Sequence, residues 1–229
     1  GRASRAYLNY QMSEDYYRGG QMIWWEADAL IRSKSGGRKS LDDFARAFFG
    51  VNDGEWKVQN TYTFEDVVKT LDGVQPYDWT TFLRDRLDGK VALTGGIEAS
   101  GWRLVYKDEP NAYAKASSRG GGADYTYSLG LSLNKDGVIG DVRWDSPAFK
   151  AGIGSGSTVV AVNGLAYDKD VLDEAVTAAK TGAPIELMLR DFDVYRTIKL
   201  DYRGGLRYPH LERIEGKPDT LTPMLTARR

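Results

Sequence analysis

The sequence predicts an α+β protein with more than one domain. The first part of the chain places apolar residues at helical spacing behind repeated capping signals. The stretch from Tyr127 to Tyr202 instead holds short β-branched runs bounded by glycine, proline and Asn-Gly turns. With 229 residues, the chain can form one large or two small domains, each with its own core. We expect a helical region over 1–90, a strand-rich connector over 91–123, a second domain over 124–203, and a tail over 204–229 that packs back.

Capping signals divide the helical region into four helices. A side-chain oxygen just before a helix accepts hydrogen bonds from backbone N–H groups that have no partner within the helix, and acidic residues suit the positive end of the helix dipole. Four such signals are present: Ser13 before Glu14 and Asp15, Ser40 with Asp43, Thr63 with Asp66, and Asp78. They predict helices over about 13–34, 40–49, 63–71 and 79–87, the first stopped by Gly36-Gly37.

The second domain is predicted from alternating and β-branched segments around one helix. Tyr127–Leu133 alternates about a central glycine, and Val159–Val162 runs into an Asn-Gly turn. A helix is expected over about 169–180, because Leu172, Val176 and Ala179 recur at four- and three-residue steps. Two further strands are expected over 185–190 and 195–201.

This order of elements resembles a PDZ domain. The resemblance is carried by Leu129-Gly130-Leu131, by Ser146-Pro147-Ala148-Phe149-Lys150-Ala151-Gly152-Ile153, and by Val162-Asn163-Gly164. It implies that backbone N–H groups of the first motif hold the C-terminal carboxylate of a peptide, which adds as a strand beside the helix. The expected peptide-binding residues are Ser128, Leu129, Gly130, Leu131, Leu172 and Val176, the last two being equally compatible with a place in the core. Ser157 stands where many PDZ domains carry an aspartate.

Composition limits the classes of partner. Lys and Arg number 31 against 32 for Asp and Glu, and no long basic run exists, which argues against nucleic acid as the main partner. The chain has no cysteine, so it has no disulfides, thiolate ligands or cysteine nucleophiles. No apolar run is long enough for a membrane span. Because the first residue is Gly1 and no signal-like segment precedes it, we expect a processed or shortened product.

An ordered set of motifs resembles the C-terminal half of the glycyl aminopeptidase family, zinc metallopeptidases also called peptidase family sixty-one. The motifs are Asp15-Tyr16-Tyr17-Arg18-Gly19-Gly20, Asp28-Ala29-Leu30-Ile31-Arg32, Ser40-Leu41-Asp42-Asp43-Phe44, Tyr62-Thr63-Phe64-Glu65-Asp66 and Gly205-Leu206-Arg207-Tyr208-Pro209. The resemblance implies that 1–90 is the helical end of a thermolysin-like catalytic domain. It also implies removal of N-terminal glycine or alanine from peptides, and an exported or periplasmic location.

The family's zinc is held by H-E-x-x-H and a downstream glutamate, and this motif is absent here. The only histidine is His210, and two histidines at helical spacing are the minimum for such a site. We therefore expect the zinc of the parent enzyme to be held by residues upstream of Gly1. This chain alone is expected to bind no zinc and to be inactive as a peptidase.

The resemblance implies one catalytic residue in this chain, Tyr17. In related zinc aminopeptidases a tyrosine followed after two residues by glycine donates its phenol to the oxyanion formed from the substrate carbonyl. Tyr17 and Gly20 match that pattern, although Gly19 stands where relatives often have a lysine. The alternative is that Tyr16 and Tyr17 pack on the apolar face of the helix. The acidic residues Glu26, Asp28, Asp42 and Asp43 are expected to be cap or surface charges.

A second reading makes the parent protein a non-catalytic PDZ module that captures peptide C-termini. The two hypotheses predict different sequences upstream of Gly1, because only the peptidase requires an H-E-x-x-H motif there. A PDZ-bearing serine protease is disfavoured. Gly154-Ser155-Gly156-Ser157 reads as a turn, and no histidine lies near it in the sequence.

Overall fold

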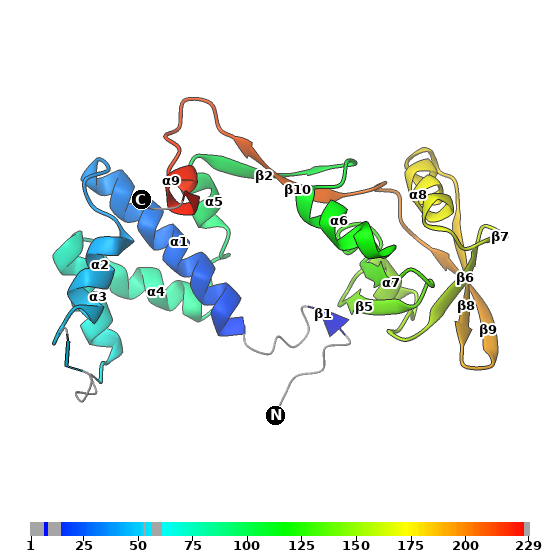
Figure 1. Ribbon diagram of the computed structural model, residues 1–229, viewed down its shortest axis with the longest axis horizontal. Coiled ribbons are helices and arrows are strands. Elements are labelled where there is room, and N and C mark those ends of the chain that lie inside the picture. Colours follow the sequence, from blue (N-terminus) through cyan, green and yellow to red (C-terminus); the bar gives the residue numbers. More distant parts are fainter. Residues whose placement is uncertain (1–6, 9–14, 53, 56–60, 227–229) are drawn as a thin grey trace. The chain divides into compact units, whose positions relative to one another are not determined.

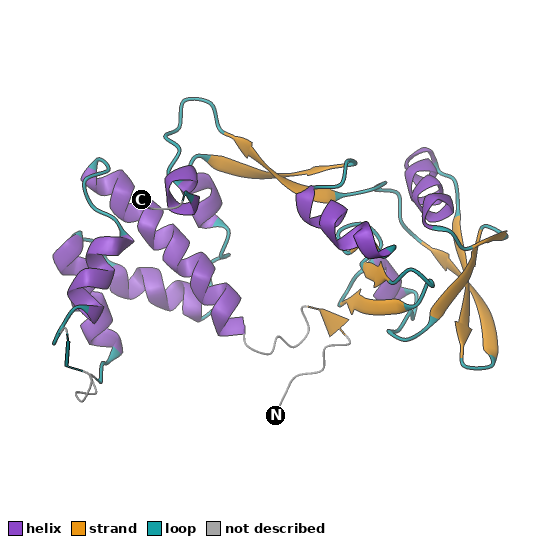
Figure 2. Cartoon of the chain, in the orientation of Figure 1, coloured by secondary structure: helices purple, strands orange, loops and turns teal. Residues whose placement is uncertain are grey.

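The computed structural model describes residues 7–8, 15–52, 54–55 and 61–226 (Figure 1). The chain forms two compact units. Unit 1 combines Gly1–Ser13 with Leu104–His210, and unit 2 combines Glu14–Arg103 with Leu211–Arg229. Helices and strands are both present, as expected for an α+β protein (Figure 2). None of the helices in the described part of the chain combines the length and apolar character that a membrane crossing requires.

Unit 2 is mainly helical. Its core forms where Ile23, Ala27 and Ile31, along one side of the first helix, meet buried side chains of the next three helices, among them Phe44 and Trp79. This pattern is the amphipathic spacing seen in the sequence. The helices of the unit are α1 (Asp15–Ser35), α2 (Leu41–Phe49), α3 (Phe64–Val74), α4 (Trp79–Leu87), α5 (Gly95–Ala99) and α9 (Leu221–Leu225).

The helix caps are confirmed where the structure describes them. Ser40 Oγ accepts from the backbone N–H of Asp42 at 3.2 Å, and the backbone N–H of Ser40 donates to Asp43 at 2.8 Å. Thr63 and Asp66 make the same reciprocal pair before α3, and Asp78 accepts from Thr81 N at 3.0 Å before α4. Helix α3 runs three residues beyond the predicted end. The predicted cap Ser13 lies outside the described residues.

Between residues 91 and 122 the structure has the strand β2 (Trp102–Lys107), which lies between two short helices, α5 and α6 (Ala112–Ser117). The second helix is followed by the 3-10 turn η1 (Ser118–Gly120), and strand β3 begins at Ala123. Two glycines begin α5 because it packs tightly on α1. A Cβ on Gly95 would collide with the carboxylate of Glu26. Helix α6 is capped by Asn111, whose side chain accepts from Ala114 N at 2.8 Å.

The tail forms regular structure rather than an extended arm. Strand β10 (Tyr208–Arg213) pairs with β2 as a two-stranded sheet. Beyond it, Trp102 Nε1 donates to Asp219 at 3.0 Å, and Thr220 N donates to Ser100 O at 3.2 Å. Leu221 at the start of α9 is buried.

The core of unit 1 is formed by two small sheets together with α7 and α8, which confirms the predicted arrangement of a PDZ domain. The first sheet has the order β1 (Tyr7–Leu8), β5 (Ile139–Arg143), β4 (Leu131–Leu133) and β3 (Ala123–Tyr125). The second has the order β7 (Leu165–Ala166), β6 (Thr158–Val162), β8 (Ile185–Asp191) and β9 (Val194–Leu200). Besides α6, the described part of unit 1 has the helices α7 (Pro147–Lys150) and α8 (Lys169–Ala178), the latter followed by the 3-10 turn η2 (Ala179–Thr181).

Candidate functional site

The predicted carboxylate loop of unit 1 already uses two of its backbone donors. The N–H groups of Ser128 and Gly130 both donate to the carbonyl oxygen of Tyr125, at 3.1 and 2.8 Å. Gly130 has a φ of 84°, and a Cβ there would collide with the side chain of Ser146, so the turn requires glycine. Ser128, Leu129 and Leu131 are buried. The carbonyl of Tyr125 thus receives the hydrogen bond of Gly130 N–H, one of the groups that the PDZ resemblance assigns to a ligand carboxylate.

Both edges of strand β4 are already paired with other strands. On one side it pairs with β5, and on the other it pairs antiparallel with β3, Tyr125 opposite Leu131 and Ala123 opposite Leu133. Capture of a peptide by strand addition needs a strand edge with free N–H and C=O groups. In the described chain, β3 therefore lies where a peptide added to β4 would lie.

The side chain of Tyr125 ties β3 to helix α8. Its phenol donates to Asp173 Oδ1 at 2.7 Å, and Asp173 also forms an ion pair with Lys169. Burial raises the pKa of the Tyr125 phenol, so it remains a hydrogen-bond donor at any ordinary pH. Leu172 and Val176, the predicted groove-lining residues, are fully buried in the same core as Tyr125. The structure places them in the core, and peptide contact with them would require β3 to leave.

We expect this closed groove to show no selectivity for a free C-terminus. A hexapeptide ending in valine and its C-terminal amide should bind the protein within about twofold of each other, because Gly130 N–H already has an acceptor and β3 covers the edge of β4. A working carboxylate loop would separate the two by about ten- to a hundredfold, the effect of charge-assisted hydrogen bonds. Fluorescence anisotropy of the labelled peptides measures this difference. A tenfold preference for the acid would show that β3 leaves readily.

In unit 2, both tyrosines at the start of α1 are exposed. Tyr16 and Tyr17 are 68% and 66% exposed, and their ring centroids lie 4.5 Å apart. The core-facing residues of α1 begin at Ile23, beyond these rings. The Tyr17 side chain therefore does not pack on the apolar face of α1. A Cβ on Gly20 would meet no described atom within 4 Å, so the space beside Tyr17-x-x-Gly20 is open in the described part of this unit.

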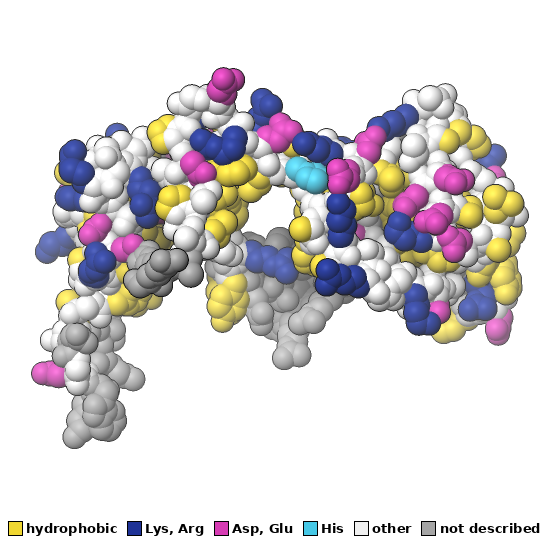
Figure 3. Space-filling view, turned by 45° about the horizontal axis from the view of Figure 1, so that its top comes forward, with side chains coloured by type: hydrophobic (Ala, Val, Ile, Leu, Met, Phe, Trp, Pro, Cys, Tyr) yellow, Lys and Arg dark blue, Asp and Glu magenta, His cyan; other side chains and the backbone are white. Residues whose placement is uncertain are grey.

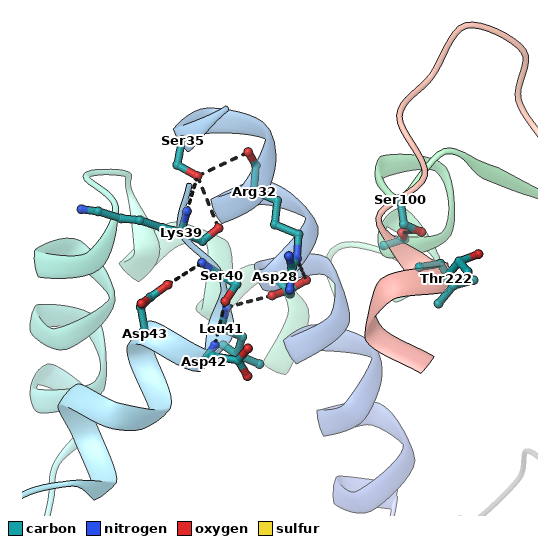
Figure 4. A network of polar contacts seen from close by, with 12 residues as sticks. Asp28, Arg32, Ser35, Lys39, Ser40, Leu41, Asp42, Asp43, Ser100 and Thr222 are labelled. Carbon is teal, nitrogen blue, oxygen red and sulfur yellow. Dashed lines mark hydrogen bonds and ion pairs between the residues drawn. The ribbon is translucent and has the colours of Figure 1, made fainter. Parts of the chain in front are cut away.

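The prediction that Glu26 and Asp28 are cap or surface charges is corrected by the structure. Asp28 is buried and holds two helices together, accepting from Arg32 Nε at 2.5 Å and from Leu41 N at 2.8 Å at the start of α2 (Figure 4). Glu26 is 13% exposed and forms a bidentate pair with Arg86 of α4, at 2.8 and 2.5 Å. Both carboxylates have structural partners.

Within the described residues, no group of three or more histidine, cysteine, aspartate or glutamate side chains is placed to hold a metal. His210 Nε2 lies 2.8 Å from the backbone oxygen of Glu109. Both residues are far from Tyr17 in the sequence. No chemical step is therefore assigned to a metal held by these residues.

Ser157 has a structural role. It is buried, and its hydroxyl donates to Asp191, which also pairs with Arg196 at 2.8 Å. The hydrogen bond from Ser157 and the Arg196 guanidinium hold the pKa of Asp191 below its usual value. The carboxylate beside this turn therefore comes from Asp191 at the end of β8. A carboxylate beside this serine, rather than a histidine, does not make it a nucleophile.

No protein-family model matches the chain, and no curated protein matches it. Among solved structures, it is similar to an aminopeptidase N family protein from Idiomarina loihiensis, with a TM-score of 0.55, 20% identity, and coverage of 93% of this chain and 36% of that chain. At this identity the likeness shows the fold. This chain spans about a third of that protein. The HtrA3 PDZ domain bound to a phage-derived ligand (FGRWV) aligns with 49% of this chain and 91% of that domain at 18% identity, with a TM-score of 0.25 that carries no weight.

Proposed function

We propose that this chain is the C-terminal part of a zinc aminopeptidase that removes N-terminal glycine or alanine from peptides. The observation that carries the proposal is the likeness in fold to an aminopeptidase N family protein along 93% of this chain. The motifs around Tyr17, Asp28 and Ser40 support the narrower assignment to the glycyl aminopeptidase family. An exported or periplasmic location belongs to the same proposal.

Tyr17 is the residue through which this chain takes part in the chemistry. Attack of water on the scissile carbonyl builds negative charge on its oxygen, and a phenol placed beside that oxygen donates a hydrogen bond to it. The Tyr17 side chain is exposed near the start of α1. The same helix is anchored further along by residues in the core of unit 2, so the backbone that carries Tyr17 is held in place. The zinc and the residues that activate the water are assigned to the upstream part of the enzyme.

The alternative, a non-catalytic PDZ module, draws support from the fold of unit 1 alone. The closed edge of β4 weighs against it, because a module that works by strand addition needs that edge. Unit 1 fits better as a covalently attached accessory unit of the peptidase.

Activity and zinc content test the proposal together. The 229-residue chain should contain no stoichiometric zinc and should not hydrolyse glycine or alanine anilides. The longer protein, prepared in parallel, should hydrolyse both and lose activity to a chelator. One tightly held zinc per 229-residue chain, or a longer protein that is inactive on both anilides, would contradict the proposal.

A further inference from the structure

Four side chains of unit 1 form a continuous series in which two neighbouring tyrosine rings lie between two arginines. The guanidinium of Arg143 lies 5.8 Å from the ring centre of Tyr127, that ring lies 5.7 Å from Tyr106, and the guanidinium of Arg207 lies 4.3 Å from the ring centre of Tyr106. We name these four residues the arginine–tyrosine strip. The four residues lie at least 16 positions apart in the sequence, so only the folded unit brings them together.

The two arginines of the strip keep their hydrogen-bonding capacity. Within the described part of the chain, neither guanidinium has a carboxylate within ion-pair distance, and each lies over a tyrosine ring, Arg207 at 4.3 Å and Arg143 at 5.8 Å from the ring centre. An arginine guanidinium carries five N–H donors, and two of them can bind a carboxylate in bidentate fashion. Tyr106 and Tyr127 are 40% and 38% exposed, so the strip is open to a partner.

Three acidic residues that lie near the strip in the sequence have other partners. Asp108 pairs with Lys180, and Glu109 pairs with Lys115 at 2.7 Å. Asp141, two residues before Arg143 on β5, shares a 3.4 Å hydrogen bond with Ser132. The positive charge of the strip is therefore not neutralised by a direct ion pair from these three carboxylates.

The strip is also held in place by the fold. The backbone N–H of Arg143 donates to Gly130 O at 2.7 Å, which fixes that arginine against the loop that follows Tyr127. Leu206, beside Arg207, packs on the core of unit 1. Tyrosine and arginine on a rigid frame are the residue types that contribute most to binding at protein interfaces, because little conformational entropy is lost.

We propose that the arginine–tyrosine strip binds an acidic peptide segment of a partner protein. The N–H groups of the two guanidiniums bind its carboxylates, and the two tyrosine rings contact the apolar parts of its side chains. Nucleic acid is the less favoured occupant. The chain has a net charge of −1, and Figure 3 shows basic and acidic side chains interspersed on the visible face rather than gathered into one basic field. This inference goes beyond the proposed peptidase function, and it does not require β3 to leave β4.

A fluorescein-labelled octapeptide of alternating glutamate and tyrosine, with both ends blocked, tests the proposal by anisotropy on the 229-residue chain. Its partner probe carries glutamine in place of each glutamate. The glutamate peptide should bind at least about tenfold more tightly at low salt, and the difference should shrink as salt rises. The variant Arg143→Gln/Arg207→Gln should lose this preference. Arg190→Gln, at an exposed arginine of β8, should keep it.

Three outcomes would overturn the proposal. They are equal binding of the two peptides, an unchanged preference in the double variant, and tighter binding of a labelled oligouridylate that the double variant also loses. The last result would reassign the strip to nucleic acid. The variant Arg143→Lys/Arg207→Lys keeps both charges but not the bidentate geometry, so it should retain part of the preference for the glutamate peptide. It replaces the glutamine variant in the test if that variant does not fold. Because the readout is binding, it is independent of whether the longer protein is a peptidase.

Discussion

Replacing Tyr17 by phenylalanine in the longer enzyme is expected to lower kcat by about a hundred- to a thousandfold. Phenylalanine keeps the ring but deletes the donor, and the loss of one oxyanion donor typically costs about 3–4 kcal/mol of transition-state stabilisation. The Tyr17 side chain is largely exposed, so zinc content and thermal stability should hardly change. Steady-state kinetics on a glycine anilide measure the effect.

Tyr16→Phe is the matched control for this experiment. Tyr16 has almost the same exposure as Tyr17 and contacts its ring, so the two variants change the helix surface in the same way. Tyr16→Phe should retain most of the activity. If Tyr17→Phe turns over as fast as the unchanged enzyme, the oxyanion donor is another group.

Removing the charge of Arg86 is expected to destabilise unit 2 by about 3–5 kcal/mol. The bidentate pair with Glu26 is shielded from water, with 12% of the Arg86 side chain exposed, and Arg86 also donates to Phe82 O at 2.9 Å. Arg86→Met keeps much of the apolar packing on the Phe82 ring but leaves the Glu26 carboxylate without its partner, which is the costly way to break a buried pair. Urea unfolding followed by tryptophan fluorescence reports on this unit, which contains Trp24, Trp25 and Trp79.

Two further variants separate the pair from a general effect of losing an arginine. Arg46→Met removes an exposed arginine that pairs with Asp43 at 3.3 Å, and it should cost less than about 1 kcal/mol. Glu26→Met/Arg86→Met removes both buried charges and should recover most of the lost stability. Equal unfolding midpoints for Arg86→Met and Arg46→Met would show that the Glu26 pair contributes nothing.

Features set by neighbouring residues could be predicted from the sequence. The caps at Ser40, Thr63 and Asp78 depend on side chains within three positions of the backbone groups they bind, so a short window contains all the information. The order of strands and helix between 127 and 201 followed from similar local patterns. The exposure of Tyr17 was harder to predict, because its position in the helix matched both a catalytic and a packing residue.

Features that depend on distant parts of the chain could not be predicted. Strand β3 has only three residues, Ala-Asp-Tyr, too few to show a pattern, and it is a strand because β4 pairs with it. The partner of Glu26 lies 60 positions away. Likewise, α5 begins with two glycines, a turn signal by sequence, because α1 leaves no room for a side chain there.

The amino-acid sequence encoded immediately upstream of Gly1 in the natural gene tests the central claim most directly. The peptidase assignment predicts H-E-x-x-H there, followed by a glutamate downstream of the second histidine, because the zinc ligands are missing from this chain. An upstream region without that motif, or without any further domain, would contradict the assignment. Tyr17 would then be an exposed tyrosine without a catalytic role.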